Sequence, residues 1–88
     1  MDLNMLRQFV VVARLEHLSR AADELHIAQP SLSRTIARLE HELGTPLFDR
    51  AARLRLNAAG ILFRGYVERA LGELDAGRRA VADATEQG

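Results

Sequence analysis

The stretch AQPSLSRTIARLEHELG, residues 28–44, decides the fold of this chain of 88 residues. A proline near its start suits a first helical turn, and the glycine at its end favours a left-handed C-terminal cap. Its apolar residues recur at helical spacing and form one narrow stripe: Leu32, Ile36, Leu39 and Leu43. We therefore predict an amphipathic helix over residues 28–44.

The face opposite this stripe is rich in arginine and small polar residues. At about 100° per residue, this face and its flanks hold Pro30, Ser31, Ser33, Arg34, Ala37, Arg38 and His41. No carboxylate occurs between Ala28 and Leu39, so the positive end of the helix dipole and two arginines act together. The second half carries Glu40 and Glu42 and is unsuited to phosphate. The first half is therefore a surface that suits an anion.

The composition allows one small domain without covalent cross-links. Nearly half of the residues are apolar, which suffices for one small core and an appended element. The absence of cysteine excludes a disulfide framework and a thiolate metal site, so a second copy is the obvious further source of stability. No secretory signal or membrane-spanning run is present, and we expect a cytoplasmic protein with no membrane partner.

Charge is unevenly distributed along the chain, although the net charge is zero. All twelve basic residues are arginine, and residues 50–67 hold four of them with no acid. Residues 68–88 hold five acids and three arginines. A neutral sum thus hides a locally basic region, which favours a nucleic-acid partner. The neutral total also leaves open a protein-interaction module built from the same helices.

The residues before this stretch predict two further helices. Asp2 is the expected N-cap of a first helix that runs to about Arg14. The predicted apolar face of that helix consists of Leu6, Phe9, Val10 and Ala13. Ser19 is the expected N-cap of a short helix over residues 20–25, in which two alanines allow close approach. A short helix, a tight turn and an amphipathic helix together predict a helix-turn-helix.

After Gly44 the hydrophobic period changes from that of a helix to that of strands. Leu47 and Phe48, and then Leu54 and Leu56, predict two short strands joined by a turn near residues 51–52. Three arginines lie on this predicted β-wing, where they could reach phosphates or a minor groove: Arg50, Arg53 and Arg55.

A long helix is predicted to follow, from Ala58 to about Thr85, with Asn57 as its N-cap and a length of roughly 40 Å. Small and apolar residues recur in it at intervals of four and three and form a heptad seam: Phe63, Val67, Ala70, Leu74, Gly77, Val81 and Ala84. Three interior glycines weaken an isolated helix, so this one needs a partner. We predict a homodimer through the seam, with a helix folded back on its own domain as the alternative.

The sequence offers no constellation for catalysis, a metal or a cofactor. The histidines are dispersed, and none is paired with a carboxylate or second histidine at metal-ligand spacing: His17, His26 and His41. Ser31 and Ser33 are separated from His41 by about 12 to 15 Å of helix, too far for a nucleophile and its base. We therefore predict a binding protein with no catalytic residue, metal ligand or cofactor, and with exposed histidines.

Much of the chain also resembles a known family, through the run LRQFVVVARLEHLSRAADELHIAQPSLSRTIARLEHELGTPLFDR followed by LRLNAAG. These residues, within 3–60, are similar to the N-terminal DNA-binding domain of LysR-type transcriptional regulators, and the pattern AAxxLxxxQPSLSRxIxxLExxLGxxLFxR is highly specific. The resemblance implies a mainly α winged helix-turn-helix, with three helices and a short two-stranded β-wing, over residues 1–57. A linker and dimerisation helix would follow over residues 58–88.

The resemblance further implies a bacterial, cytoplasmic homodimer that regulates transcription and binds double-stranded DNA at a pseudo-palindromic site. Family members carry an effector-binding domain after the linker. A small-molecule effector would then act only through a domain not present in this chain, and the longer parent could form a tetramer.

Roles of single residues follow from the resemblance where positions match. It implies major-groove contacts for Gln29, Pro30, Ser33 and Arg34. Arg53 matches the wing residue near the minor groove or backbone, and Ser31 and Arg38 are expected phosphate contacts. Ala28 departs from the usual Ser or Thr and removes a hydroxyl N-cap worth about 1 kcal/mol, whereas Asn57 in place of Thr should cap equally well.

Overall fold

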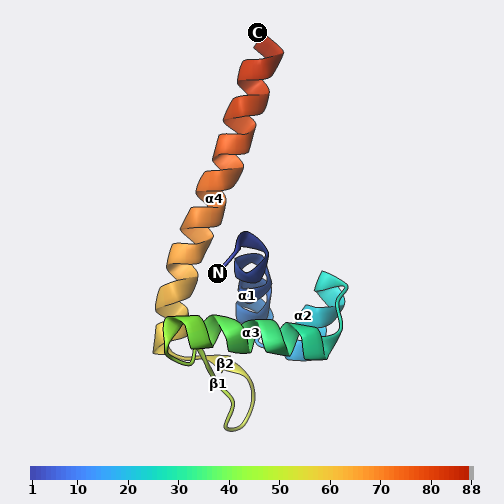
Figure 1. Cartoon of the computed structure of the whole chain (residues 1–88), viewed down its shortest axis with the longest axis vertical. Coiled ribbons are helices and arrows are strands. Elements are labelled where there is room, and N and C mark those ends of the chain that lie inside the picture. Colours follow the sequence, from blue (N-terminus) through green and yellow to red (C-terminus); the bar gives the residue numbers. More distant parts are fainter. Residues whose placement is uncertain (88) are drawn as a thin grey trace.

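Four helices and a two-stranded hairpin follow one another along the part of the chain that the structure describes. The computed structural model describes residues 1–87 and, of these, the side chains of residues 1–86. The elements occur in the order α1 (Leu3–Leu15), α2 (Leu18–Leu25), α3 (Gln29–Leu43), β1 (Phe48–Asp49), β2 (Arg55–Leu56) and α4 (Ala58–Gln87). Figure 1 shows α1, α2 and α3 gathered at one end, with the hairpin below α3 and α4 rising away from them.

One core joins α1, α2, α3, the hairpin and the start of α4. Its largest fully buried side chains are Phe9, Val12, Leu32, Ile36, Leu39 and Leu47. Three of these form the predicted stripe of α3, and Leu43 lies half-buried beside them, so the stripe is confirmed. Ala21 and Ala22 are also buried, and their small side chains let α2 pack closely against α1 and α3. We call residues 1–57, which supply most of this core, the head.

The buried face of α1 differs from the predicted one. The residues that it buries are Met5, Gln8, Phe9, Val12 and Ala13. The predicted Leu6 and Val10 are only half-buried. Because α1 packs against α2, α3 and α4 at once, the neighbouring helices determine which side is buried. A single apolar stripe could not indicate this.

The helix caps confirm three predictions and correct one. The Asp2 carboxylate accepts a hydrogen bond from the Met5 amide at 2.8 Å and caps α1 as predicted. Ser19 is not the cap of α2, because Glu16 ends α1 in a left-handed conformation (φ 49°) and α2 already begins at Leu18. His17 Nδ1 is the cap instead and accepts from the Arg20 amide at 3.2 Å. α3 starts after Ala28 without a side-chain cap and ends at the left-handed Gly44, as the sequence predicts.

The predicted wing is present as a short antiparallel hairpin. Its register pairs Phe48 with Leu56 and Asp49 with Arg55. The strands are shorter than the apolar pattern indicated, with two residues each. Leu47 and Phe48 are buried in the core, and the loop from residue 49 to 53 is exposed. The wing is therefore anchored at its base and free at its tip.

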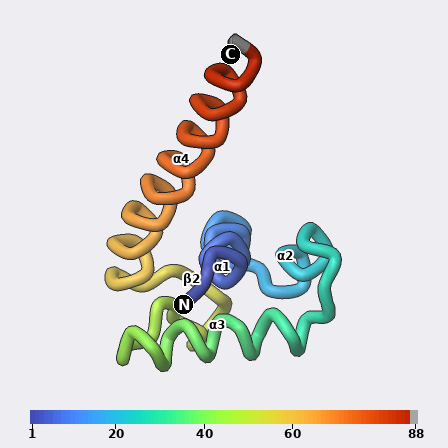
Figure 2. The backbone as a smooth tube through the Cα atoms, turned by 45° about the horizontal axis from the view of Figure 1, so that its top comes forward, coloured from blue at the N-terminus to red at the C-terminus, as the bar shows by residue number. Residues whose placement is uncertain are grey.

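The first half of α4 packs on the head, and this corrects the predicted seam. Asn57 caps α4 as predicted and accepts from the Gly60 amide at 2.8 Å. The Phe63 ring lies 5.5 Å from that of Phe9, and Val67 is only 3% exposed. Val67 is therefore part of the chain's own core and has almost no surface left for a second copy. Figures 1 and 2 both show the remaining half of α4 leaving the head as a straight rod.

Gly60 permits the close approach of α4 to the head. A Cβ added there would overlap the carbonyl oxygen of Leu47 and would lie 2.7 Å from Cδ2 of Leu56. No L side chain fits without movement of the backbone, so glycine sets the position from which α4 departs.

Candidate nucleic-acid interface

The N-terminal half of α3 presents a polar and cationic face to solvent. All the residues predicted there to contact DNA are exposed: Gln29, Pro30, Ser31, Ser33, Arg34 and Arg38. The opposite side of the helix is buried through its apolar stripe, which fixes the orientation of these side chains. Arg34 is only loosely held, by a contact of 3.4 Å to the Ser31 hydroxyl. Its guanidinium is thus available to a ligand.

Four arginines of this region have no carboxylate partner among the residues that the structure describes. They are Arg34 and Arg38 of α3 together with Arg53 and Arg55 of the wing, and all are exposed. Unpaired guanidinium groups repel one another and attract phosphate, which they can bind with two parallel hydrogen bonds. The neutral net charge of the chain therefore coexists with a cationic surface.

Arg50 differs from the other predicted contacts on the wing. Its guanidinium lies 3.3 Å from Glu40 and 5.9 Å from the centre of the Phe48 ring. Glu40 therefore neutralises part of its charge and restrains its position. The sequence suggested that Glu40 repels phosphate, but its side chain is only 13% exposed and is turned toward the wing.

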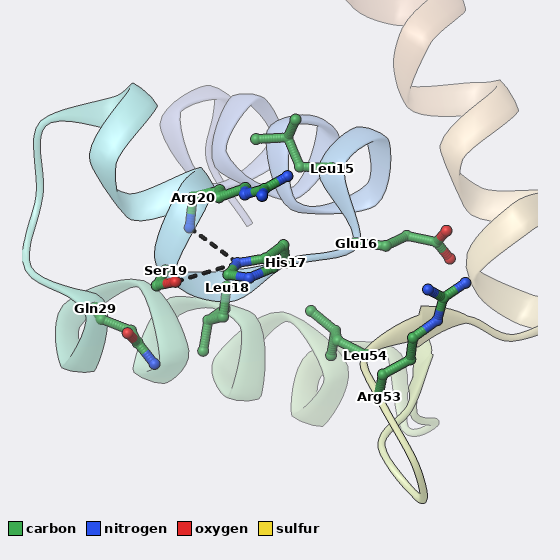
Figure 3. Close-up of a pocket in the computed structure, with 9 residues that line it drawn as sticks. All are labelled: Leu15, Glu16, His17, Leu18, Ser19, Arg20, Gln29, Arg53 and Leu54. Carbon is green, nitrogen blue, oxygen red and sulfur yellow. Dashed lines mark hydrogen bonds between the residues drawn. The ribbon is translucent and has the colours of Figure 1, made fainter.

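An open hollow of about 590 Å³ lies between α3, α2 and the wing. Figure 3 shows Gln29 on one side of it and Arg53 with Leu54 on the other, with Leu18 between them. The sequence indicated no link between Gln29 and Arg53, and the fold brings both to the edge of one hollow. A nucleic-acid strand that contacts α3 at Gln29 would therefore also contact the wing at Arg53.

The same hollow includes three residues that sequence reasoning missed. His17, Ser19 and Arg20 line it from the start of α2. The His17 ring accepts from the Arg20 amide and lies 3.1 Å from the Ser19 hydroxyl. Their signal in the sequence was a cluster of polar and basic residues around the start of the predicted helix, of which only Ser19 was assigned a role, as a cap. All three histidines of the chain are exposed, as predicted.

The part of α4 after the buried Val67, residues 68–86, which we call its free half, carries the rest of the predicted seam. Ala70, Leu74, Gly77 and Val81 are exposed, with 43% of Leu74 and 67% of Val81 accessible. Leu74, Gly77 and Val81 also line a shallow apolar groove. Nearer the head, three large exposed side chains lie outside the heptad positions and were missed: Ile61, Leu62 and Tyr66.

Over residues 1–87, no three histidine, aspartate or glutamate side chains are grouped so that they could hold a metal ion. No helix in this range combines the length and the apolar character needed to cross a membrane.

Comparison with known proteins places this geometry in a family. The family model described as "Bacterial regulatory helix-turn-helix protein, lysR family" matches residues 3–61. The chain is 43% identical over 82 residues to the uncharacterized HTH-type transcriptional regulator YybE of Bacillus subtilis, which covers 92% of this chain and 28% of YybE. It is 55% identical over 64 residues to the HTH-type transcriptional regulator BudR of Klebsiella aerogenes, covering 72% of this chain and 45% of BudR.

A solved structure agrees with this sequence comparison. The crystal structure of the BenM_DBD/benA site 1 DNA complex matches with a TM-score of 0.92 and 38% identity, over 96% of this chain and 99% of that chain. The likeness confirms the predicted winged helix-turn-helix with a long C-terminal helix. The chain spans less than half the length of the two curated relatives. From its sequence and its fold, the chain belongs to the lysR family of bacterial regulatory helix-turn-helix proteins.

Proposed function

We propose that this chain is the DNA-reading part of a LysR-type transcriptional regulator and binds double-stranded DNA at specific sites. The observation that carries the proposal is the exposed cationic face formed by α3 and the wing, where Arg34, Arg38, Arg53 and Arg55 have no acidic partner among the described residues. The similarity to a protein solved in a complex with DNA supports it. The protein-interaction alternative is not favoured by these relatives.

In this proposal α3 enters the major groove, which is wide enough for one helix. The Gln29 amide has both a donor and an acceptor, so it can read adenine with two hydrogen bonds or another base edge with one. Arg34 either reads guanine or anchors a phosphate, and Pro30 and Ser33 lie against the base edges. Ser31 and Arg38 contact phosphates and set the register of the helix in the groove.

The wing adds affinity with little base preference. Arg53 lines the hollow, Arg55 is exposed on β2, and both would contact the backbone or the minor groove. Arg50 would contribute less than the sequence suggested, since Glu40 already holds its guanidinium.

The free half of α4 would pair with a second copy. Ala70, Leu74, Gly77 and Val81 give it an exposed face of small and apolar residues, and covering this face would stabilise a helix that contains glycine. A two-fold dimer presents two α3 helices, which suits a pseudo-palindromic site. A tetrameric parent, a small-molecule effector bound by a domain outside this chain and a cytoplasmic location stay predictions.

The decisive test selects bound DNA from a random pool with this chain and then measures affinity by fluorescence anisotropy at rising salt. We expect an enriched site with two related halves. The affinity should fall steeply, because each neutralised phosphate contributes about −0.9 to the slope of log K against log salt. No enrichment, or an affinity that salt leaves unchanged, would refute the proposal.

A further inference from the structure

Two carboxylates reach from the helices to the backbone of the wing, one to each strand. Glu40 of α3 accepts a hydrogen bond from the Leu47 amide at 2.6 Å and a longer one from the Phe48 amide at 3.4 Å. Glu16, at the end of α1, accepts from the Leu56 amide at 2.8 Å. Figure 3 shows Glu16 extended from that end toward the wing, near Arg53 and Leu54. Both carboxylates therefore act on main-chain groups of the hairpin.

The wing depends on such support because its own hydrogen bonding is slight. The two strands have two residues each, and a two-stranded hairpin is marginal in water even when it is longer. Leu47 and Phe48 are buried, so their amides have little access to water and need an acceptor. Glu40 supplies it, and its other oxygen lies 3.3 Å from the Arg50 guanidinium.

The placement of these carboxylates couples the wing to the reading helix. Glu40 is on α3, the helix that carries Arg34 and Arg38 on its outer face. Glu16 binds the backbone of β2. This strand carries Arg55 and comes directly after Arg53 and Leu54 in the chain. Glu40 therefore fixes the first part of the wing relative to α3, and Glu16, which lines the hollow, fixes the second.

We propose that Glu40 and Glu16 are positioning residues, which set the distance between the wing arginines and α3 and so determine how both engage DNA. This inference rests on the proposed DNA binding. The change in DNA affinity that it predicts on removal of either carboxylate is opposite in sign to the change that simple electrostatics predicts. Removing a negative charge near DNA should strengthen binding, whereas removing a positioning carboxylate should weaken it.

Glu42 offers a matched control on the same helix. It lies two residues after Glu40, is exposed, and pairs with the N-terminal ammonium at 2.8 Å instead of holding the wing. We expect Glu40→Ala to weaken DNA binding about tenfold and Glu40→Gln about threefold, because glutamine keeps one acceptor but loses the charge. Glu42→Gln should leave the affinity unchanged or raise it.

Coupling to a wing arginine tests the positioning role directly. Arg53→Ala should reduce affinity in the unmodified chain, and should do so about threefold less in a Glu16→Ala background, where the wing is already displaced. Equal effects of Arg53→Ala in both backgrounds would overturn the role of Glu16.

Amide hydrogen exchange gives a readout that needs no DNA. Glu40→Ala should speed exchange at Leu47 and Phe48, and Glu16→Ala at Leu56, while the amides of α3 keep their protection. Unchanged exchange at these three amides would overturn the proposal, as would faster exchange with unaltered DNA affinity. If the unmodified chain bound no DNA at all, the proposed function would be refuted, and exchange would still report whether the carboxylates hold the wing.

Discussion

The two long helices of this chain, α3 and α4, use their apolar residues in opposite ways. α3 has 15 residues and buries its stripe along almost its whole length, so the head holds it from end to end. α4 has 30 residues, but among those with described side chains Val67 is the last that is buried. Beyond Leu71 this helix extends away from the core.

This difference explains why the exposed faces of the two helices differ in chemistry. The apolar residues of α3 are buried in the core. Its outward face therefore holds Gln29, Arg34 and Arg38 at fixed positions in solvent. The free half of α4 still exposes Leu74 and Val81. A helix that packs on the core along its length can present a polar recognition surface. A helix that extends beyond the core with apolar residues exposed needs a second chain to cover them.

The largest expected effect would come from breaking the contact that holds α4. Gly60→Ala places a methyl group against the Leu47 carbonyl, which belongs to the backbone and moves little. We expect a loss of about 3 kcal/mol in the free energy of unfolding, at the upper end for overpacking. Urea unfolding followed by circular dichroism measures it, and a stability equal to that of the unmodified chain would contradict the close approach.

The next effect concerns the free half of α4. Leu74→Glu should weaken the proposed homodimer by roughly 2 to 3 kcal/mol, because it removes apolar surface and adds a charge in both copies. Sedimentation should then show monomers at micromolar concentration, while the control Ala76→Glu, on the opposite side of the helix, stays dimeric. A monomeric unmodified chain would refute the dimer.

The outward face of α3 is tested by removing one guanidinium. Arg34→Ala should reduce DNA affinity by roughly 1 to 3 kcal/mol and relax base preference, and Gln29→Ala should act similarly. Arg53→Ala on the wing should lower affinity more evenly across sequences. Arg79→Ala, on the free half of α4, is the control and should change anisotropy titrations little. Unaltered binding by Arg34→Ala would remove this residue from the interface.

The smallest effect is expected at Gly72, which lies in the same helix as Gly60 but has open space around it. No atom lies within 4 Å of a Cβ added at Gly72, so Gly72→Ala should stabilise α4 by about 0.5 to 1 kcal/mol. Thermal unfolding at low protein concentration measures this gain. Destabilisation would mean that position 72 is crowded in solution, unlike in the single chain.

Local patterns were sufficient to predict most of the head. The stripe of α3, the left-handed cap at Gly44 and the caps Asp2 and Asn57 follow from spacing and from side chains that act within a few residues. The resemblance to LysR-type regulators and the winged helix-turn-helix were likewise correct. The exposed arginines of α3 were predictable because the buried side of a helix determines its outer side.

Contacts between distant residues were not predictable in this way. Glu16 and Leu56 are far apart in sequence, and the six residues between Glu40 and Leu47 include the turn that brings them together. His17, two residues before the expected cap Ser19, caps α2 because the left-handed Glu16 ends α1 just before it. The heptad spacing of α4 also could not predict which of its residues contact a second copy and which pack in the chain's own core, because the spacing is the same in both cases.

The sequence by itself determined the family, the helices and the residues that α3 shows to solvent, because these depend on short-range periodicity and capping. Only the tertiary structure decided that Val67 belongs to the core, that Gly60 sets the departure of α4, and that Glu16 and Glu40 hold the wing. The physical reason is that burial and long-range hydrogen bonds depend on which surfaces meet, and this is settled only when the whole chain packs.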